Sequence, residues 1–465
     1  MKTLVIPTAR ATFAVEIADK RASDAKALLS SLGADVFGPA NLVMNDDDIA
    51  AAQPFVEEPA DLIIHVCASF CDAAPAQRLY ANVDQPILLW SFREPGVAGD
   101  KLWLNSLCGA NLIAHALVRD GKEVRVVYGD PDDPAVAETL KAALDGDLPA
   151  AHPLPGSDGE RVSEAEADEL LAALNGQTIG VIGEAPTGFT PSQYDPELLE
   201  NLFGLNVEKL DLQALFAEIT AVPAETRAEE LASAEAWQPS LKELDPEHVD
   251  KFAAVTTALR EWRMNTNAAA LAVRCWPEFP TELGVCPCSA LSRLADEDTA
   301  TQCERDVYGA ATMLLLKTLG AGMTYLVDTV DLDAERNLVR FWHCGSAATK
   351  LAADPANATQ YIHANRKIGV AGNFPLKTGP VIAVRLTEDP GTQGLRMLIA
   401  SGESTTAPNR FQGNTADVIM DCNADTFVRS LVTGGFPHHT VLSWVDVRPQ
   451  LRAIADRLNI PVVEF

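Results

Sequence analysis

Apolar runs typical of strands alternate with helical stretches through the first 170 residues of the chain. The runs lie at residues 4–6, 62–66, 86–90 and 124–127, and helical spacing recurs between them, as at 22–32 and 107–118. This alternation is the signature of a doubly wound parallel sheet. The sequence Ser-Glu-Ala-Glu that begins at Ser163 is a capping signature and predicts one further helix. We therefore predict an α/β domain over residues 1–171.

A second α/β unit begins with the apolar segment 178–183. It contains predicted helices at 252–263 and 299–318 and a predicted strand at 270–274. Gly320 and Gly322 should end the last of these helices. The glycines of the opening segment do not match Gly-x-Gly-x-x-Gly, which argues against a dinucleotide cofactor. We predict a second α/β domain over residues 172–324.

From Tyr325 onward the pattern changes to alternating strands separated by turn signals. The predicted strands are at residues 338–344, 379–386, 395–400 and 417–421, and residues 333–337 should form a hairpin loop. A helix at 447–458 and a short strand at 461–464 end the chain. These features predict a β-rich C-terminal domain over residues 325–465.

The composition is that of a globular protein with large buried cores. The chain has 465 residues, 47% of them hydrophobic and 22% charged, which suits two or three domains. A net charge of −29 argues against nucleic acid and anionic membranes as partners. The N-terminus lacks a signal-peptide pattern, and no apolar run approaches the roughly 20 residues that span a bilayer. We therefore expect a cytoplasmic protein with no membrane partner.

The nine cysteines are expected to be reduced, because their number is odd and the chain is not a small secreted domain. Cys286, Cys288, Cys303 and Cys344 could imitate a zinc site. Their spacing, however, lacks the paired Cys-x-x-Cys knuckles of structural zinc. We favour small buried hydrophobic residues as their role and keep zinc as the alternative.

Two carboxylates occupy positions where a polar residue needs a reason. Glu304 lies in the predicted helix and shares its apolar face with residues 307, 308, 311 and 315. Asp328 ends the apolar run 323–327, at the predicted carboxyl end of a strand, where α/β sheets present ligands. The structural alternative is a carboxylate that merely stabilises a helix start.

Imidazoles follow in the same part of the chain. His343 alternates with Val339 and Phe341 and should point into the core that they build. His438 and His439 follow two glycines and precede an apolar run, as in a turn that leads into a strand. A lone histidine on a strand is often just a hydrogen-bonded core residue, but the joint pattern favours a site. Two carboxylates with one or two imidazoles suit Mn²⁺ or another divalent cation better than a thiolate-rich zinc site.

The chain resembles the L-fucose isomerase and L-arabinose isomerase superfamily of metal-dependent aldose–ketose isomerases. The resemblance covers about the C-terminal two thirds of the chain. It rests on Asp328 and on the segments 180–189, 275–279, 287–288, 303–306, 342–345 and 434–440. It implies a barrel-like C-terminal domain and interconversion of an open-chain aldose and its ketose through a cis-enediol.

The resemblance also implies roles for individual residues. Glu304 and Asp328 would bind the metal and transfer the proton, and His439 would be a metal ligand. Asp328 follows the fucose branch, whereas His343 looks like the additional ligand of the arabinose branch. His438 would contact the substrate. Because the chain mixes the two branches, the resemblance does not identify the sugar.

In that superfamily the first domain of a neighbouring subunit completes the pocket. The resemblance thus implies a homo-oligomer, a trimer or hexamer, with active sites between subunits. Arg10 and Trp90, each expected just past an N-terminal strand, would contact the substrate from the neighbour. The structural alternative is a surface arginine and a partly buried tryptophan. Other functions remain open: another metal-dependent sugar enzyme, such as an epimerase or lyase, or a non-catalytic sugar-binding protein.

Overall fold

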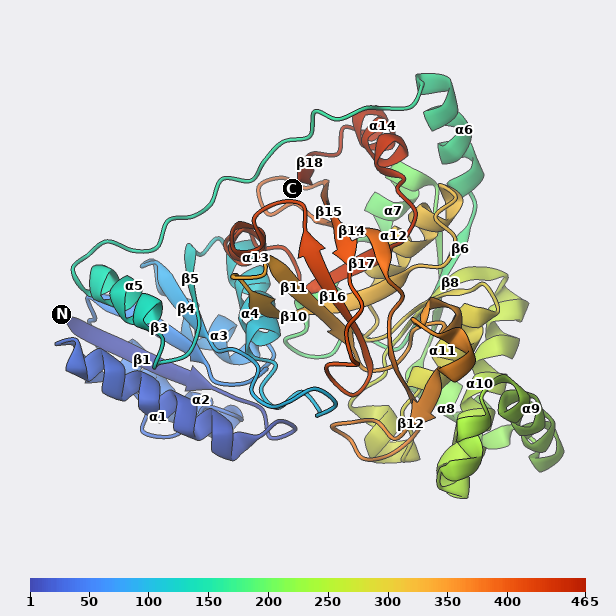
Figure 1. The fold of residues 1–465 in the computed structure, drawn as a ribbon, viewed down its shortest axis with the longest axis horizontal. Helices are drawn as coiled ribbons and strands as arrows, with labels where there is room; N and C mark the ends of the chain where they lie inside the picture. Colours follow the sequence, from blue (N-terminus) through green and yellow to red (C-terminus); the bar gives the residue numbers. More distant parts are fainter.

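The computed structural model describes residues 1–465. The first sheet has five parallel strands in the order β2-β1-β3-β4-β5. Helices α1 and α5 pack on one face, and α2, α3 and α4 pack on the other, so the sheet is doubly wound (Figure 1). Strand β2 was not predicted. The elements are β1 Lys2–Thr8, α1 Val15–Ser31, β2 Asp35–Phe37, α2 Asp46–Val56, β3 Leu62–Cys67, α3 Ala74–Leu79, β4 Ile87–Ser91, α4 Ser106–Arg119, β5 Val124–Tyr128 and α5 Pro134–Leu144.

The second sheet has four parallel strands in the order β7-β6-β8-β9. The chain reaches it by an extended crossing from α5 to α6 along the top of Figure 1, and Ser163 caps α6 as predicted. The elements are α6 Glu164–Leu174, β6 Thr178–Ile182, α7 Pro196–Phe203, β7 Asn206–Leu210, α8 Leu212–Ala221, α9 Ala224–Trp237, α10 Pro246–Thr266, β8 Ala268–Val273, α11 Cys288–Asp296, β9 Ala300–Gln302 and α12 Val307–Thr318.

The helix predicted over residues 299–318 is wrong in its first part. Residues Ala300–Gln302 pair with β8 as a parallel strand, and the helix begins only at Val307. Gly320 and Gly322, which follow the end of α12, both have positive φ angles. Parallel sheets and covering helices thus confirm a mixed α/β chain.

The third sheet is mixed and has nine strands in the order β12-β13-β16-β11-β10-β17-β14-β15-β18. An additional pairing between β15 and β16 closes the six strands from β16 to β15 into a barrel. The hairpin predicted at 333–337 joins β10 and β11. The elements are β10 Tyr325–Asp333, β11 Leu338–His343, β12 Thr359–Tyr361, β13 Ala371–Pro375, β14 Gly379–Glu388, β15 Leu395–Ser404, β16 Asn414–Met420, α13 Ala424–Thr433, β17 His439–Ser443, α14 Arg448–Leu458 and β18 Val462–Glu464.

The barrel lies between the other two sheets (Figure 1). Helix α12 packs against β8 and β9 on one side and against β14 and β17 on the other. Helix α4 packs against β10, and α13 packs against α4 and β5, so the first sheet also meets the barrel. No helix is long and apolar enough to cross a membrane. The three parts of the chain therefore meet where β10 and β17 run side by side.

Candidate active site

His439 and Asp328 lie opposite each other on neighbouring antiparallel strands. His439 is the first residue of β17, and its register partner on β10 is Asp328. Directly paired residues project from the same face of a sheet, so the two side chains meet. His439 Nε2 lies 3.3 Å from Asp328 Oδ1. Asp328 was expected at the end of a strand, but β10 continues to Asp333, so the aspartate lies within the strand.

Glu304 reaches the same imidazole from the turn between β9 and α12. Its Oε2 lies 2.9 Å from His439 Nε2. Glu304 and Arg305 have φ angles of 60° and 55°, a left-handed conformation that costs on the order of 1–3 kcal/mol per residue and is common at functional sites. Ser192 Oγ donates to the Glu304 carbonyl, and Arg305 donates to the Ser192 carbonyl, which holds the turn. Glu304 is therefore not on a helix face, as the periodicity had predicted.

Asp306, which the sequence analysis missed, fixes the orientation of His439. It caps α12 through the backbone N–H of Gly309, and His439 Nδ1–H donates to its Oδ2 over 2.8 Å. Arg385 on β14 forms a double hydrogen bond with the same carboxylate, with Nη2 2.9 Å from Oδ1. Metal-ligating histidines commonly donate their second N–H to a carboxylate in this way. Nε2 is thereby directed toward Glu304 and Asp328.

Burial and pairing shift the ionisation of this cluster. Burial opposes ionisation of Glu304, but the hydrogen bond and charge of His439 outweigh it and lower the pKa of the carboxyl. Burial likewise disfavours a charged His439, but the neighbouring carboxylates of Asp306, Asp328 and Glu304 raise the pKa of the imidazole. The pKa of Asp306 is lowered, because Arg385 and His439 outweigh its burial. The two pocket carboxylates thus compete for one cationic ring.

The rings of the other two predicted histidines lie close to that of His439, with centroids 5.8 Å away for His343 and 4.1 Å away for His438. Ligand atoms of His343, Asp328 and His439 all lie within 4.8 Å of one another. His438 is buried between the rings of Phe70 and Phe189, with ring centroids 6.3 and 5.4 Å away. Burial is the largest cause of the lowered pKa of both His343 and His438, which favours neutral imidazoles.

One pocket joins these residues to the first part of the chain. It is lined by Glu304, Asp328, His343 and His438, and also by Arg10, Phe13, Phe70 and Asn105 from the N-terminal region. Trp276 forms one wall, and its Nε1–H donates to Glu304 Oε1 over 2.8 Å. Arg10 lies over the face of the same indole, 4.3 Å from the ring centroid.

Arg10 therefore reaches the pocket from its own chain. The sequence analysis had placed it in a neighbour's pocket, because the resemblance implies a pocket that the first domain of another subunit completes. Arg10 lines this pocket without a second subunit. The homo-oligomer itself stays a prediction.

The assignment of Trp90 to substrate contact is wrong. It lies within β4, is fully buried, and its indole N–H donates to the Gly129 carbonyl over 2.9 Å. Parallel strands covered on both faces bury every side chain, which the position of Trp90 in an apolar run indicated.

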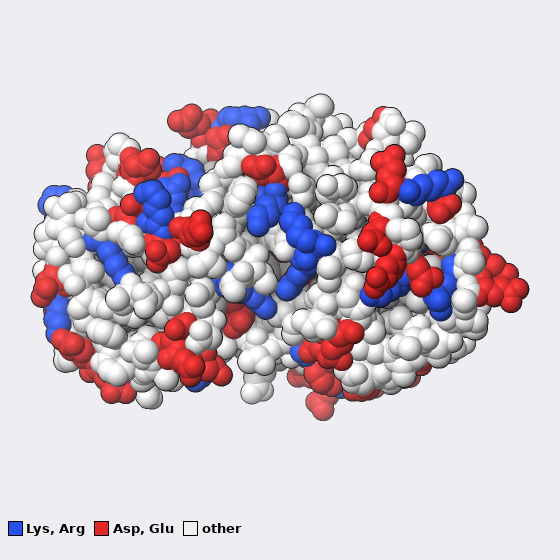
Figure 2. Space-filling view, turned by 90° about the horizontal axis from the view of Figure 1, so that it is seen from below, with Lys and Arg blue, Asp and Glu red and all other residues white.

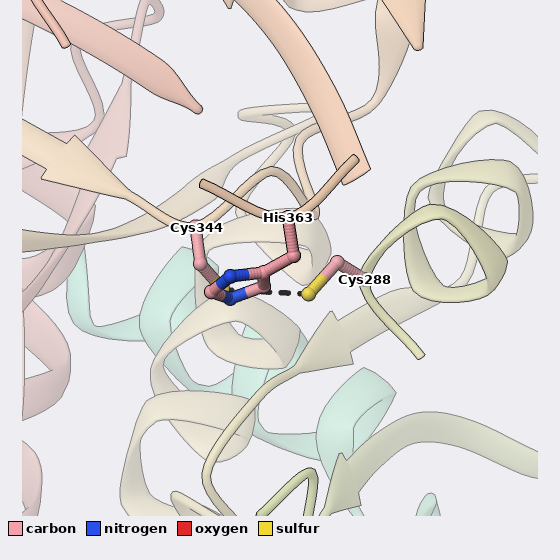
Figure 3. Close-up of side chains that lie close together, drawn as sticks. All are labelled: Cys288, Cys344 and His363. Carbon is pink, nitrogen blue, oxygen red and sulfur yellow. Dashed lines mark hydrogen bonds between the residues drawn. The ribbon is translucent and has the colours of Figure 1, made fainter. Parts of the chain in front are cut away.

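Thiols form another wall of the pocket. Cys288 Sγ lies 3.5 Å from Cys344 Sγ, and His363 lies against both (Figure 3). Cys344 Sγ is also 3.2 Å from His343 Nδ1, and Cys303 is close by. Hydrogen bonds among the thiols, together with burial, raise the pKa of Cys288 and Cys344 well above the ordinary value. All nine cysteines are free. The fold thus brings together cysteines whose spacing had argued against a common site.

The centre around His439 has the chemistry of a divalent-cation site. Asp328 Oδ1 and His438 Nδ1 are buried and lack hydrogen-bond partners. Carboxylate oxygens of Glu304 and Asp328 face one imidazole nitrogen, a donor set that suits Mn²⁺ and similar ions. These three side chains, with His343 within reach, could hold such a cation.

Three full-length relatives bear on what the pocket does. The chain is 35% identical over 466 residues to the sulfoquinovose isomerase of Alkalicoccus urumqiensis, a match that covers 100% of this chain and 99% of that protein. It is 32% identical to the sulfoquinovose isomerase of Priestia megaterium and 30% identical to that of a Clostridium species, in each case over 98% of this chain and 97% of the relative. No model of a protein family matches the chain.

These matches confirm the prediction of an enzyme, an isomerase, and exclude the non-catalytic alternative. Because they span all three sheets at an identity of 30–35%, they relate the whole molecule and not one part of it. The chain belongs to the sulfoquinovose isomerase family.

Proposed function

We propose that this protein converts sulfoquinovose, a glucose-type aldose with a sulfonate at C6, into the corresponding ketose with the aid of a divalent cation such as Mn²⁺. The names of the full-length relatives support the substrate. The observation that carries the chemistry is the pair of carboxylates, Glu304 and Asp328, which are the only two that line the pocket. The segments that resemble the fucose and arabinose isomerases meet at this pair, which favours membership of that superfamily.

The isomerisation moves a proton between C1 and C2 of the open-chain sugar through a cis-enediol. It needs a base at one carbon and an acid at the other, and two carboxylates in different surroundings can divide these tasks. Glu304 is held by Trp276 and His439, whereas Asp328 keeps one oxygen without a hydrogen bond. The geometry therefore favours a fixed orientation for Glu304 and a free acceptor on Asp328.

Glu304, Asp328 and His439 would hold the cation, with His343 as a further ligand. When bound, it would polarise the two oxygens on C1 and C2. Asp306 would keep Nε2 of His439 directed at the site. Phe70 and Phe189, which pack on His438, would exclude water from this end of the pocket.

The proposal is tested by incubating the metal-loaded protein with sulfoquinovose in D₂O and following the ketose by NMR. We expect a ketose product, with deuterium at the exchanged carbon if the proton equilibrates with solvent. An epimeric aldose or a cleaved product would instead support the epimerase or lyase alternative. Absence of any sulfoquinovose conversion by a metal-loaded, folded protein would contradict the proposal.

A further inference from the structure

We propose that Arg10 and Arg366 form the subsite that binds the anionic group at C6 of the sugar. Arg10 follows β1, and Arg366 lies in the loop between β12 and β13, yet both line the pocket of Glu304 and Asp328. This inference rests on the proposed function for the identity of the sugar. The subsite itself is defined by its chemistry, which is a monoanionic sulfonate bound by two guanidinium groups.

Neither guanidinium has a hydrogen-bonded or ion-paired partner, although that of Arg10 lies over the rings of Trp276 and Phe70. The side chains of Arg10 and Arg366 make no hydrogen bond and have no carboxylate within 4.0 Å, whereas buried Arg385 forms a double hydrogen bond with Asp306. Both residues are partly buried. A partly buried charge without a partner is costly, and in a chain with 65 acidic and 36 basic residues partners are plentiful. Two unpaired arginines at one pocket therefore indicate an anionic ligand.

The placement of Arg10 suits the far end of a hexose. The edge of the Trp276 indole binds Glu304, and its face carries the Arg10 guanidinium. One indole ring thus separates the end where carbons C1 and C2 would react from the first cation. Arg366 lines the same pocket, so both guanidinium groups can face one ligand.

His363 holds the loop that carries Arg366. The backbone N–H of Arg366 donates to His363 Nδ1 over 3.2 Å. The His363 ring lies against Cys288 and Cys344 in the thiol wall (Figure 3). Burial lowers the pKa of His363 to about 3, so it is a neutral positioning residue and adds no charge. Asn365, on the same loop, lines the pocket with its amide oxygen buried and without a partner.

Arginine is the side chain that matches this ligand. A sulfonate is a permanent anion with three acceptor oxygens, and a guanidinium is always charged and offers paired donors. A C6 phosphate shares this chemistry but carries more charge near Glu304 and Asp328. We therefore expect the sulfonate to be preferred, and a phosphorylated sugar is one arm of the test.

The kinetic test compares sulfoquinovose, glucose and glucose 6-phosphate in wild type, Arg366→Gln and Arg366→Lys. Hydrogen bonds to charged groups are worth about 10–100-fold in binding, so Arg366→Gln should lower kcat/KM for sulfoquinovose by that factor, mainly through KM. Glucose should lose far less, and Arg366→Lys should recover part of the loss. Arg263→Gln, which removes another partly buried arginine without a carboxylate partner, should leave kcat/KM for both sugars unchanged. Equal losses on both sugars, or a wild type that prefers the phosphate, would overturn the proposal.

A binding test separates the subsite from the isomerase activity. The probe is 2,3-dihydroxypropane-1-sulfonate, with glycerol as its neutral match, and the readout is the shift in Tm. We expect stabilisation by the sulfonate alone, and loss of that shift in Arg366→Gln and Arg10→Gln. If the shift occurs without turnover of sulfoquinovose, the proposed function fails and the subsite stands. If sulfoquinovose turns over but the sulfonate shifts Tm no more than glycerol does, the subsite fails and the function stands.

Discussion

Two carboxylates that lie two residues apart, Glu304 and Asp306, bind opposite nitrogens of His439 but have different surroundings. Asp306 is fully buried and fully compensated by Arg385, His439 and the start of α12. Glu304 faces the pocket and shares the imidazole with Asp328. The fully paired carboxylate of Asp306 stabilises the fold. Glu304 and Asp328 share one imidazole nitrogen, so their negative charge is not fully neutralised and can bind a ligand. Compensation, and not burial alone, separates structural from functional carboxylates here.

The largest expected effect comes from neutralising the pocket pair. Glu304→Gln and Asp328→Asn should each lower kcat by roughly 10²–10⁴-fold, because each would remove one of the two proposed proton-transfer groups. Thermal unfolding should show a folded protein in both cases. Either variant with more than about a tenth of wild-type activity would contradict the assigned role.

Breaking the buried ion pair between Arg385 and Asp306 should lower the stability of the fold. Arg385→Met leaves Asp306 buried with an incomplete partner, which typically costs about 3–5 kcal/mol in the free energy of unfolding. The measurement is urea denaturation of metal-free protein. Arg448→Met removes an arginine from the more exposed pair with Asp446 and should cost about 1 kcal/mol or less. Similar losses in both variants would mean that the buried pair has no special role.

Metal affinity should sharpen the contrast between the two histidines. A chelator should abolish activity, and Mn²⁺ should restore it better than Zn²⁺, because oxygen and imidazole donors favour such ions. His439→Ala should lose more metal than His438→Ala, as measured by elemental analysis after dialysis. Asp306→Asn, which keeps the ligands but loosens the ring, should weaken binding by about 10–100-fold. Equal metal content in the two histidine variants would contradict the ligand assignment.

Most strands could be predicted from the sequence, because buried strands such as β3 and β4 are continuous apolar runs. Helix caps were also visible, as at Ser163. Glu304 was found for a partly wrong reason: its left-handed turn has no periodicity, and the apolar spacing continued by chance into α12. Asp306 was overlooked because it seemed to be one more residue of that helix, although an aspartate before an apolar helix is a capping signal.

The pocket could not be read in the same way. Arg366 lies in an irregular loop without a sequence pattern. It stands out because its side chain lines the pocket without a hydrogen bond or a carboxylate partner, and this can be seen only in the folded chain. Arg10 was found through a family resemblance, but its position beside Trp276 of the same chain depends on how the first sheet packs on the barrel. The cysteines show the reverse case, since long-range packing brought together residues whose spacing argued against it.

The acidic surface has a consequence for the rate at which the substrate arrives. On the face drawn in Figure 2, Lys and Arg gather around the hollowed middle, while Asp and Glu lie mainly toward its ends. With a net charge of −29, the molecule as a whole repels an anionic sugar, and its arginines attract only at short range. Added salt screens the long-range repulsion first, over a Debye length of about 10 Å at 0.1 M. Under encounter-limited conditions, kcat/KM for the sulfonated sugar should therefore rise a few-fold with ionic strength, while that for glucose stays flat.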